Sequence, residues 1–222
     1  MAQREMHWTM DGDDGSWSEW ASRLAASPAW DLINGLISKF EPGRQGWALD
    51  IGCGTGRAFE PLSRKGYQTI GIDPIWAAAQ ASCSRARKHQ IGAWAVMATA
   101  EMLPVKQKSV QAVLAVCCLF HLGPDELENA LLEIKRVLII GGEAIVHFLE
   151  IGDWRQALGK PGKIEDLPRY GYKAVVTGFF TVETMHELIR KAGLTVKEQM
   201  SRVQEDEQGE RRDWFFHCVQ AA

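Results

Sequence analysis

Short apolar runs alternate with helical patterns along most of the chain. The runs predicted to be strands are WALDIG (47–52), YQTIGID (67–73), GAWAVMA (92–98), SVQAVLAVCC (109–118) and EAIVHFLEI (143–151). Between them, residues 57–65, 74–89 and 124–138 are predicted helices, and the last of these is clearly amphipathic. The fourth run is apolar almost throughout, as expected for a central strand that is buried on both faces. This alternation predicts an α/β fold with a mostly parallel sheet and helices on both faces.

The beginning of the chain is predicted to be helical. Two short helices, 16–27 and 28–40, precede the first strand, and the second starts with a proline, which is favourable at a first helical position. Four of the nine tryptophans precede the first strand, and such side chains are costly to leave in water: Trp8, Trp17, Trp20 and Trp30. We expect residues 1–45 to form an N-terminal lid or cap over a main domain at 46–222. The alternative is that this segment covers a sheet edge and a helix face.

The end of the chain predicts an edge hairpin. An irregular stretch, 152–178, is followed by a helix at 181–193 and by two strand candidates, LTVKEQM (194–200) and DWFFHCVQ (213–220). No helix is predicted between these two strands, so they are expected to pair antiparallel at one edge of the sheet. The predicted fold is therefore a doubly wound, mostly parallel, seven-stranded Rossmann-like sheet with an antiparallel edge hairpin.

The amino-acid composition limits the classes of function that the chain can have. The formal net charge of the 222 residues is −3, which argues against a nucleic-acid-binding surface. The five cysteines contain no CxxC pair and indicate neither a disulfide framework nor a zinc site, and no other metal site is predicted. No signal peptide and no apolar run near the roughly 20 residues of a membrane span is apparent. We therefore expect a cytoplasmic protein that does not enter a membrane.

The stretch WALDIGCGTGRAF (47–59) carries the most specific chemistry. Its glycines follow the spacing GxGxG, whereas a dinucleotide loop needs GxGxxG, and the required third glycine is here Arg57. The Gly-Lys-Ser/Thr ending of a Walker phosphate loop is absent too. Asp50 places a carboxylate where phosphates would be repelled. The loop therefore favours close backbone approach to a cationic or neutral ligand.

A second acid follows the next strand. Asp73 lies 21 residues after Gly52, about the distance at which such an acid reaches the two hydroxyls of a ribose. A nucleoside with free hydroxyls, no phosphate and a positive centre describes S-adenosylmethionine. The alternative is that Asp73 and Pro74 only cap the next helix, where both residue types are favoured.

Several motifs occur in an ordered set. LDIGCGTGR, IGIDP, ATAEMLP and AVLAVCCLFHL, followed by LLEIKRVLIIGGEAIV and FTVETMHELIRKAGLTV, resemble the consecutive motifs of class I S-adenosylmethionine-dependent methyltransferases. The resemblance is to the small-molecule branch known as methyltransferase type 11 and covers roughly residues 47–196. The main domain would then be the S-adenosylmethionine-binding domain.

The resemblance implies a set of cofactor contacts. The first acid and the glycines would line the methionine end and the ribose, Asp73 would hold the ribose hydroxyls, and Ile75 or Trp76 would pack on the adenine. Thr99 replaces an aspartate that the family often carries for the adenine amino group, so this contact is expected to be weaker. The cofactor-binding residues implied by the resemblance are Asp50, Gly52, Cys53, Gly54, Gly56, Asp73, Pro74, Ile75, Thr99, Ala100, Glu101 and Cys117.

Methyl transfer requires alignment, desolvation and sometimes deprotonation of a nucleophile that the substrate already carries. The candidate catalytic residues are His121, which follows the fourth strand, and His147, near the carboxyl end of the fifth. Either histidine could instead be structural, hydrogen-bonded in a loop or packed under a helix. The predicted substrate-pocket residues are Trp17, Trp20, Trp154, Tyr170 and Tyr172.

The sequence therefore predicts an enzyme that transfers a methyl group from S-adenosylmethionine to oxygen, nitrogen or carbon of a small metabolite. Its expected partner is that small-molecule acceptor, and the chain is expected to be a monomer or homodimer. Three alternatives stay open: a tRNA or other nucleic-acid methyltransferase on the same fold, an NAD-dependent oxidoreductase, and a non-catalytic cofactor-binding protein. The motifs specify the donor and leave the acceptor open.

Overall fold

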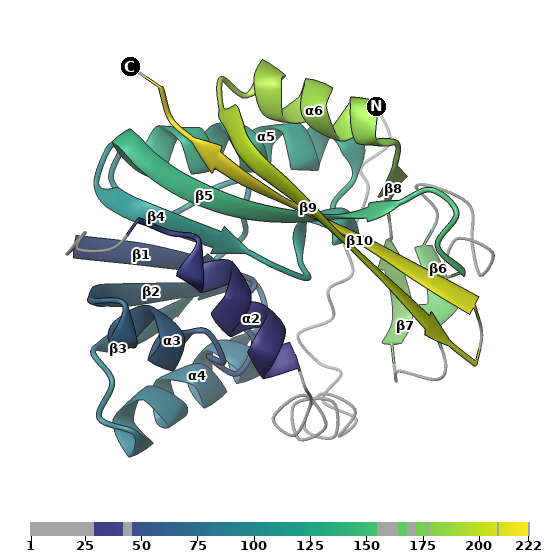
Figure 1. The fold of residues 1–222 in the computed structure, drawn as a ribbon. Helices are drawn as coiled ribbons and strands as arrows, with labels where there is room; N and C mark the ends of the chain where they lie inside the picture. Colours follow the sequence, from purple (N-terminus) through teal and green to yellow (C-terminus); the bar gives the residue numbers. More distant parts are fainter. Residues whose placement is uncertain are drawn as a thin grey trace, which may run out of the picture.

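The structure is a computed structural model that describes residues 29–41, 46–154, 164–167, 172–176, 178–207 and 209–221. Its centre is one twisted sheet with the strand order β3-β2-β1-β4-β5-β10-β9, and β8 pairs with β5 beside this path (Figure 1). The strands are β1 (Gly46–Ile51), β2 (Tyr67–Asp73), β3 (Ala93–Met97), β4 (Val110–Ala115), β5 (Leu138–Glu150), β8 (Phe179–Phe180), β9 (Thr195–Asp206) and β10 (Gly209–Val219).

Pairing directions confirm the predicted architecture. Strands β1 to β5 pair parallel with one another, whereas β10 runs antiparallel to both β5 and β9. The seven-strand path with an edge hairpin is therefore present, with the two-residue β8 added to it. The stretch predicted to be irregular carries a separate antiparallel pair, β6 (Ile164–Leu167) and β7 (Tyr172–Val176). These strands are short and lack strong alternation, so hydrophobic patterning did not indicate them.

Helices cover both faces of the sheet. One face carries α2 (Ala29–Ser38), α3 (Phe59–Arg64) and α4 (Trp76–Lys88), and the other carries α5 (Pro124–Val137) and α6 (Val182–Lys191) (Figure 1). Both α3 and α4 begin two residues later than predicted, because the glycine loop and the Asp73–Pro74 turn occupy those positions. No helix in the described part of the chain is long and apolar enough to cross a bilayer.

Helix α2 belongs to the core. Its side chains Ile33, Leu36 and Ile37, together with Phe40, are buried against small and aliphatic residues of β1 and β4. This part of the predicted N-terminal segment therefore packs firmly on the sheet. The predicted helix at 16–27 lies outside the described residues, and a lid over 1–45 stays a prediction.

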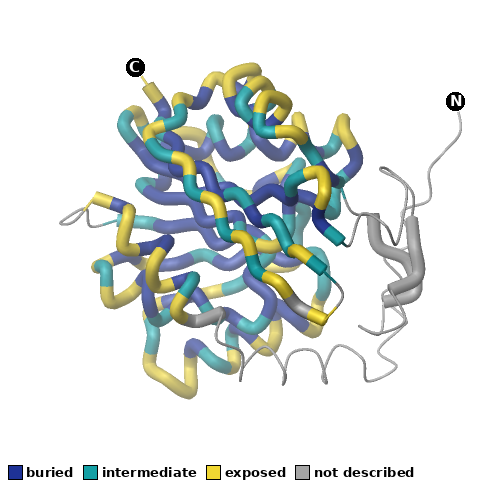
Figure 2. The backbone as a smooth tube through the Cα atoms, turned by 45° about the vertical axis from the view of Figure 1, so that its right-hand side comes forward, coloured by how far each residue is buried: buried dark blue, intermediate teal, exposed yellow. Residues whose placement is uncertain are grey.

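Burial is greatest along the central strands, which form the dark-blue interior in Figure 2. Ala112 to Ala115 of β4 and Ala144 to Leu149 of β5 are almost wholly inaccessible to solvent. Asp50 and Asp73 lie at the carboxyl ends of β1 and β2, and each is 5% exposed. Buried carboxylates are costly unless they are hydrogen-bonded or paired, so this edge of the sheet is a candidate ligand site.

A buried polar network lies on a different part of the same sheet. Glu143 in β5 is 1% exposed and accepts hydrogen bonds from the Glu41 amide, Lys197 and His217. Glu41 follows α2, Lys197 lies in β9 and His217 in β10. The Glu143 carboxylate therefore ties α2 and the edge hairpin to the central sheet.

Candidate active site

The glycine loop joins β1 to α3 with an unusual backbone. Gly52, Gly54 and Gly56 all have positive φ, at 68°, 51° and 73°, where residues with a side chain are strained. The amides of Gly52 and Cys53 both donate to the Ile72 carbonyl, at 2.7 and 3.0 Å, and this pins the loop to the end of β2. A Cβ atom on Gly52 would lie 2.5 Å from Cβ of Cys118. The loop therefore needs glycine both for its conformation and for its contact with the segment after β4.

Asp73 holds the loop from the neighbouring strand. One carboxylate oxygen accepts from the Gly54 amide at 2.9 Å, and the other accepts from the Ile75 amide at 3.0 Å. The bond from the Ile75 amide caps the turn before the next helix, which is the alternative role that the sequence left open for Asp73. The structure shows this bond together with the bond to the glycine loop. An ionised carboxylate offers about four acceptor positions, so capacity for further donors remains.

The electrostatics of the two acids favour a positive ligand group. Burial, reinforced by the neighbouring Asp73, raises the pKa of Asp50 to about 7, although Arg57 opposes the shift. Burial also raises the pKa of Asp73, while its two backbone hydrogen bonds act in the opposite direction. A cation beside Asp50 would stabilise its charged form and relieve part of this cost.

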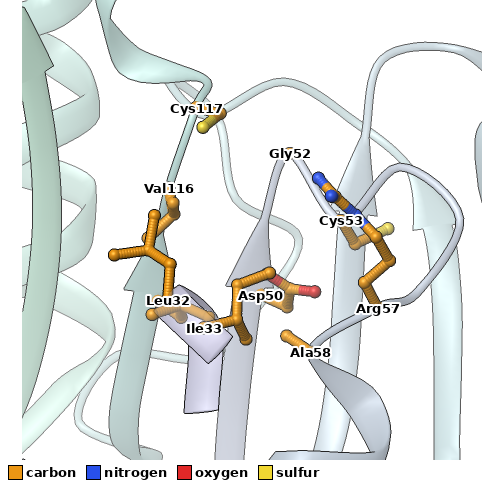
Figure 3. Close-up of a pocket in the computed structure, with 10 residues that line it drawn as sticks. Leu32, Ile33, Asp50, Gly52, Cys53, Arg57, Ala58, Val116 and Cys117 are labelled. Atoms are coloured by element: carbon orange, nitrogen blue, oxygen red, sulfur yellow. The ribbon is translucent and has the colours of Figure 1, made fainter. Parts of the chain in front are cut away.

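A small cavity of about 40 Å³ opens between the loop and α2 (Figure 3). Four of the predicted cofactor-binding residues line it, and Arg57, which was not among them, lines it too. The full lining is Leu32, Ile33, Asp50, Gly52, Cys53, Arg57, Ala58, Leu114, Val116 and Cys117. In the sequence, Arg57 directly follows the glycine loop, but it was considered only as the residue that replaces the third glycine of a dinucleotide loop.

The wall formed by Cys117 is held from behind by a buried histidine. Cys117 has a φ of 62°, and its amide donates to Nδ1 of His147 at 3.1 Å. The other ring nitrogen, Nε2, lies 3.2 Å from the Asp213 carboxylate. The ring is 2% exposed, stacked on Phe215 at 4.4 Å and met edge-on by Phe120 at 5.2 Å. His147 thus supports the Cys117 turn and does not line the cavity.

The hydrogen bonds of His147 define its protonation. Burial disfavours the imidazolium, but the Cys117 thiol and the Asp213 carboxylate raise the pKa of His147 overall. The Cys117 amide nevertheless needs a lone pair on Nδ1, so in this arrangement the ring is neutral and Nε2–H donates to Asp213. A proton on both nitrogens would set two donors against each other and release the turn.

The other predicted cofactor-binding and catalytic residues are not part of the cavity lining. His121 ends a short 3₁₀ turn after β4, where its ring meets Phe120 at 4.4 Å. The loop after β3 reaches the second acid, because the Ala98 amide donates to the Asp73 carbonyl at 3.2 Å. This loop carries the predicted adenine-side residues Thr99, Ala100 and Glu101. Pro74 and Ile75 follow Asp73 directly.

The predicted substrate-pocket residues are described only in part. Trp17, Trp20 and Tyr170 lie outside the described residues, and Tyr172 is described by its backbone in β7. Trp154 is half-buried, and its Cβ lies 3.1 Å from where a Cβ on Gly209 would be, so it packs at the turn between β9 and β10. These five residues stay predictions. Within the described residues, no cluster of three or more histidine, cysteine or acidic side chains is placed to hold a metal ion.

A doubly wound sheet with a glycine loop after β1 and a buried acid at the end of β2 is typical of nucleotide-binding and nucleoside-binding α/β proteins. Comparison with known protein families points to a methyltransferase domain. Residues 49–146 match the family model Methyltransf_11, described as a methyltransferase domain. This match agrees with the predicted class I S-adenosylmethionine-dependent methyltransferase domain over residues 49–146.

One curated relative and several solved structures are similar to this chain. A 41-residue segment is 51% identical to the ubiquinone biosynthesis O-methyltransferase of Bradyrhizobium diazoefficiens, over 18% of this chain and 15% of that protein. A methyltransferase structure from Methanosarcina mazei superposes with a TM-score of 0.71 at 18% identity, over 84% of this chain and 97% of that one. A Burkholderia thailandensis 1,6-didemethyltoxoflavin-N1-methyltransferase gives 0.70 at 18% identity, over 94% and 85%. At such identities the two structures establish the shared fold.

Proposed function

We propose that this chain transfers a methyl group from S-adenosylmethionine to oxygen, nitrogen or carbon of a small metabolite. The observation that carries the proposal is the left-handed glycine loop between Asp50 and Asp73, two buried acids at adjacent carboxyl strand ends. When bound, S-adenosylmethionine supplies an electrophilic methyl group on a positively charged sulfur. The protein's contribution is to bind the donor, orient the acceptor and exclude water from the reacting atoms.

Each element of the site has a proposed role. Asp50 faces the positive end of the donor, Asp73 accepts from the ribose hydroxyls, and the loop glycines allow close backbone approach. Ile75 and the loop after β3, from Thr99 to Glu101, border the adenine. Cys117 lies beside the transferred group, and His147 fixes its backbone from behind. His121 stays the candidate for aligning or deprotonating the acceptor, because its ring follows the same strand.

A small-molecule acceptor is supported by two observations. The net charge of −3 does not favour association with a nucleic acid, whose phosphates require a basic surface. A protein of the same fold, the Burkholderia thailandensis enzyme, was solved with bound 1,6-didemethyltoxoflavin and S-adenosylhomocysteine. Tight RNA binding that weakens steeply with added salt would contradict this part of the proposal.

The donor assignment is tested through Asp73. Asp73→Asn keeps the size of the side chain but replaces one acceptor oxygen with an N–H donor. Loss of a hydrogen bond to a charged group costs about 1.5–3 kcal/mol, so affinity for S-adenosylhomocysteine should fall about 10- to 100-fold. The same loss is expected for 5′-methylthioadenosine, which keeps the ribose. Calorimetry measures both, with the exposed Glu128→Gln as a charge-matched control. Unchanged affinity for both ligands would remove the ribose role.

The affinity for S-adenosylhomocysteine should depend on pH through Asp50. Its carboxyl has a pKa near 7 in the ligand-free protein, and the ligand's ammonium group would lower that pKa by favouring the ionised form. Binding below pH 7 therefore expels a proton, and affinity should fall by up to about tenfold per pH unit on acidification. Above about pH 8 the affinity should level off.

Calorimetry in buffers with different ionisation enthalpies measures the released proton directly. Asp50→Asn cannot ionise and should give a flat profile between pH 6 and 8. A wild-type affinity that is constant over this range, with no proton release, would show that Asp50 does not face the cationic end of the ligand.

A further inference from the structure

Cys117 is the only exposed cysteine among the five of the chain. It follows β4 in a left-handed turn with a φ of 62°, a conformation that is uncommon for residues other than glycine. Its side chain belongs to the wall of the cavity beside the glycine loop (Figure 3). The fold therefore holds one accessible sulfur in a fixed position at the candidate site.

The other four cysteines are less accessible or have an engaged sulfur. Cys53 and Cys218 are buried, and burial raises the pKa of both thiols. Cys118 is half-buried, and its Sγ donates to the last carbonyl of β1 at 3.2 Å. Cys83 is also half-buried, and its Sγ accepts from a backbone amide of β3 at 3.3 Å. A reagent that attacks thiols from solvent should therefore distinguish Cys117 from the rest.

A buried pair behind Cys117 can take its proton. Nδ1 of His147 lies 3.1 Å from the Cys117 amide nitrogen, and Nε2 lies 3.2 Å from the Asp213 carboxylate. The order thiol, imidazole, carboxylate is that of an activated cysteine, in which a third group orients the base next to the nucleophile. An imidazolium formed in this way would be stabilised by Asp213. It would also release the Cys117 amide, so the turn would open as the thiol loses its proton.

The charges around Cys117 favour its ionised form. Loss of hydration in the cavity wall raises the pKa of the Cys117 thiol, and Asp213 acts in the same direction. His147 and Arg57, which lines the same cavity, outweigh both and hold the pKa of Cys117 below its ordinary value. The thiolate is the reactive form, and only a few per cent of an ordinary thiol is ionised at pH 7. Cys117 is therefore expected to be the most reactive sulfur of the chain.

We propose that Cys117 is a modification site, at which hydrogen peroxide oxidises the thiol to a sulfenic acid. The sulfur attacks one peroxide oxygen, so that an S–O bond forms and the O–O bond breaks. The thiol proton passes to Nδ1 of His147 and from there to the departing hydroxide, which leaves as water. Sulfur is thereby oxidised by two electrons and the peroxide is reduced. The added oxygen lies in the cavity wall, so oxidation should also weaken binding of the methyl donor. This last consequence rests on the proposed function.

The first test locates the oxidised sulfur. The full chain is treated with hydrogen peroxide and dimedone, which reacts with sulfenic acids, and peptide fragment spectra identify the labelled residue. We expect the label on Cys117 and on no other cysteine. Cys117→Ser should lose the label, whereas the matched control Cys83→Ser should keep it. No label on Cys117, or labelling of Cys83 at the same rate, would overturn the proposal.

The second test follows the rate of alkylation by iodoacetamide between pH 6 and 9. At pH 7, wild-type Cys117 should react about tenfold faster than Cys83. Its rate should reach half of the maximum at a lower pH than expected for an ordinary thiol. The titratable or charged groups that act on the Cys117 thiol, and so shape this profile, are His147 on β5, Asp213 on β10, Arg57 after the glycine loop and the neighbouring Cys118.

Two variants test the neighbours of Cys117 independently. His147→Gln removes the base and Arg57→Met removes the positive charge, so each should slow alkylation of Cys117 and move its profile to higher pH. The second variant alters a half-buried side chain and is informative even where the first fails to fold. Arg64→Met is the matched control, because its side chain on α3 is 68% exposed, and its profile should equal that of the wild type. An unchanged profile in Arg57→Met and in folded His147→Gln would overturn the proposed activation.

The link to the methyl donor is measured separately. S-adenosylhomocysteine should protect Cys117 from both reagents, and the oxidised protein should bind it about tenfold more weakly in calorimetry. Equal affinity of the oxidised and reduced proteins would overturn this link. If the reduced protein did not bind S-adenosylhomocysteine at all, the proposed function would fail. The modification of Cys117 would then still stand, because its labelling is measured without ligand.

Discussion

Replacing Gly52 with alanine should abolish measurable binding of S-adenosylhomocysteine and destabilise the fold. The residue has a φ of 68°, and a left-handed backbone costs an L-residue about 1–2 kcal/mol. The new Cβ would also lie 2.5 Å from Cβ of Cys118, so the loop or the segment after β4 must move. Such overpacking costs about 1–3 kcal/mol more. Because both segments line the site, we expect at least about 100-fold weaker binding, measured by calorimetry beside thermal unfolding.

Three variants separate the cost of the left-handed backbone at Gly52 from the cost of the steric clash with Cys118. Gly66→Ala has a φ of 98° with open space around the new Cβ, and it should show the backbone cost alone. Gly92→Ala has neither strain nor a neighbour within 4 Å and should be close to neutral. Adding Cys118→Gly to Gly52→Ala removes the colliding atom and should recover part of the stability. Equal stability of Gly52→Ala and Gly66→Ala would show that the contact with Cys118 is not rigid.

Local signals predicted the part of the site that lies on one continuous segment. The glycine spacing, Asp50 before it and Asp73 after the next strand could all be located from sequence. They depend on strand ends and turns, whose residue preferences are local. The structure links them directly, since Asp73 accepts from the Gly54 amide. The mostly parallel sheet with its edge hairpin was predicted from the alternation of elements, whereas the order of the strands comes from the structure.

Long-range pairs could not be predicted in this way. His147 could be placed near the carboxyl end of its strand, but its partner Asp213 is 66 residues further along the chain. The two meet because β10 lies antiparallel beside β5, in a register that the sequence pattern does not specify. Arg57 was missed for a related reason. Whether its side chain pairs with an acid or stays open depends on which neighbours the folded chain brings to it.

The hydrogen-bond network around Glu143 could not be predicted from the sequence either. It is the basis of a second prediction with a large expected effect. Glu143 accepts from the Glu41 amide at 2.9 Å, from Nζ of Lys197 at 2.7 Å and from Nε2 of His217 at 3.1 Å. Glu143→Ala would leave these three donors without their shared acceptor. Breaking a buried charged pair typically costs about 3–5 kcal/mol, and we expect the lower end because Lys197 is partly exposed and can be hydrated again.

Two measurements check this prediction. Denaturant unfolding should show the full loss for Glu143→Ala. Its matched control, Glu198→Ala, removes the partner of Lys39 at an exposed site and should cost about 0–1 kcal/mol. A loss of similar size in both variants would contradict a special role for the buried carboxylate.

The free energy of unfolding should also depend on pH through Glu143, and the direction of this dependence follows from the pKa of its carboxyl. Burial alone would raise the pKa of Glu143, but the Glu41 amide, Lys197 and His217 outweigh it and hold the pKa below its ordinary value. An acid with a lowered pKa stabilises the fold above the pKa it has when unfolded and loses that contribution on acidification. The free energy of unfolding should therefore fall as the pH drops below about 4.5, and less steeply in Glu143→Ala. Because Glu41 follows α2, which provides Leu32 and Ile33 to the cavity, the variant should also loosen that wall and weaken binding of S-adenosylhomocysteine.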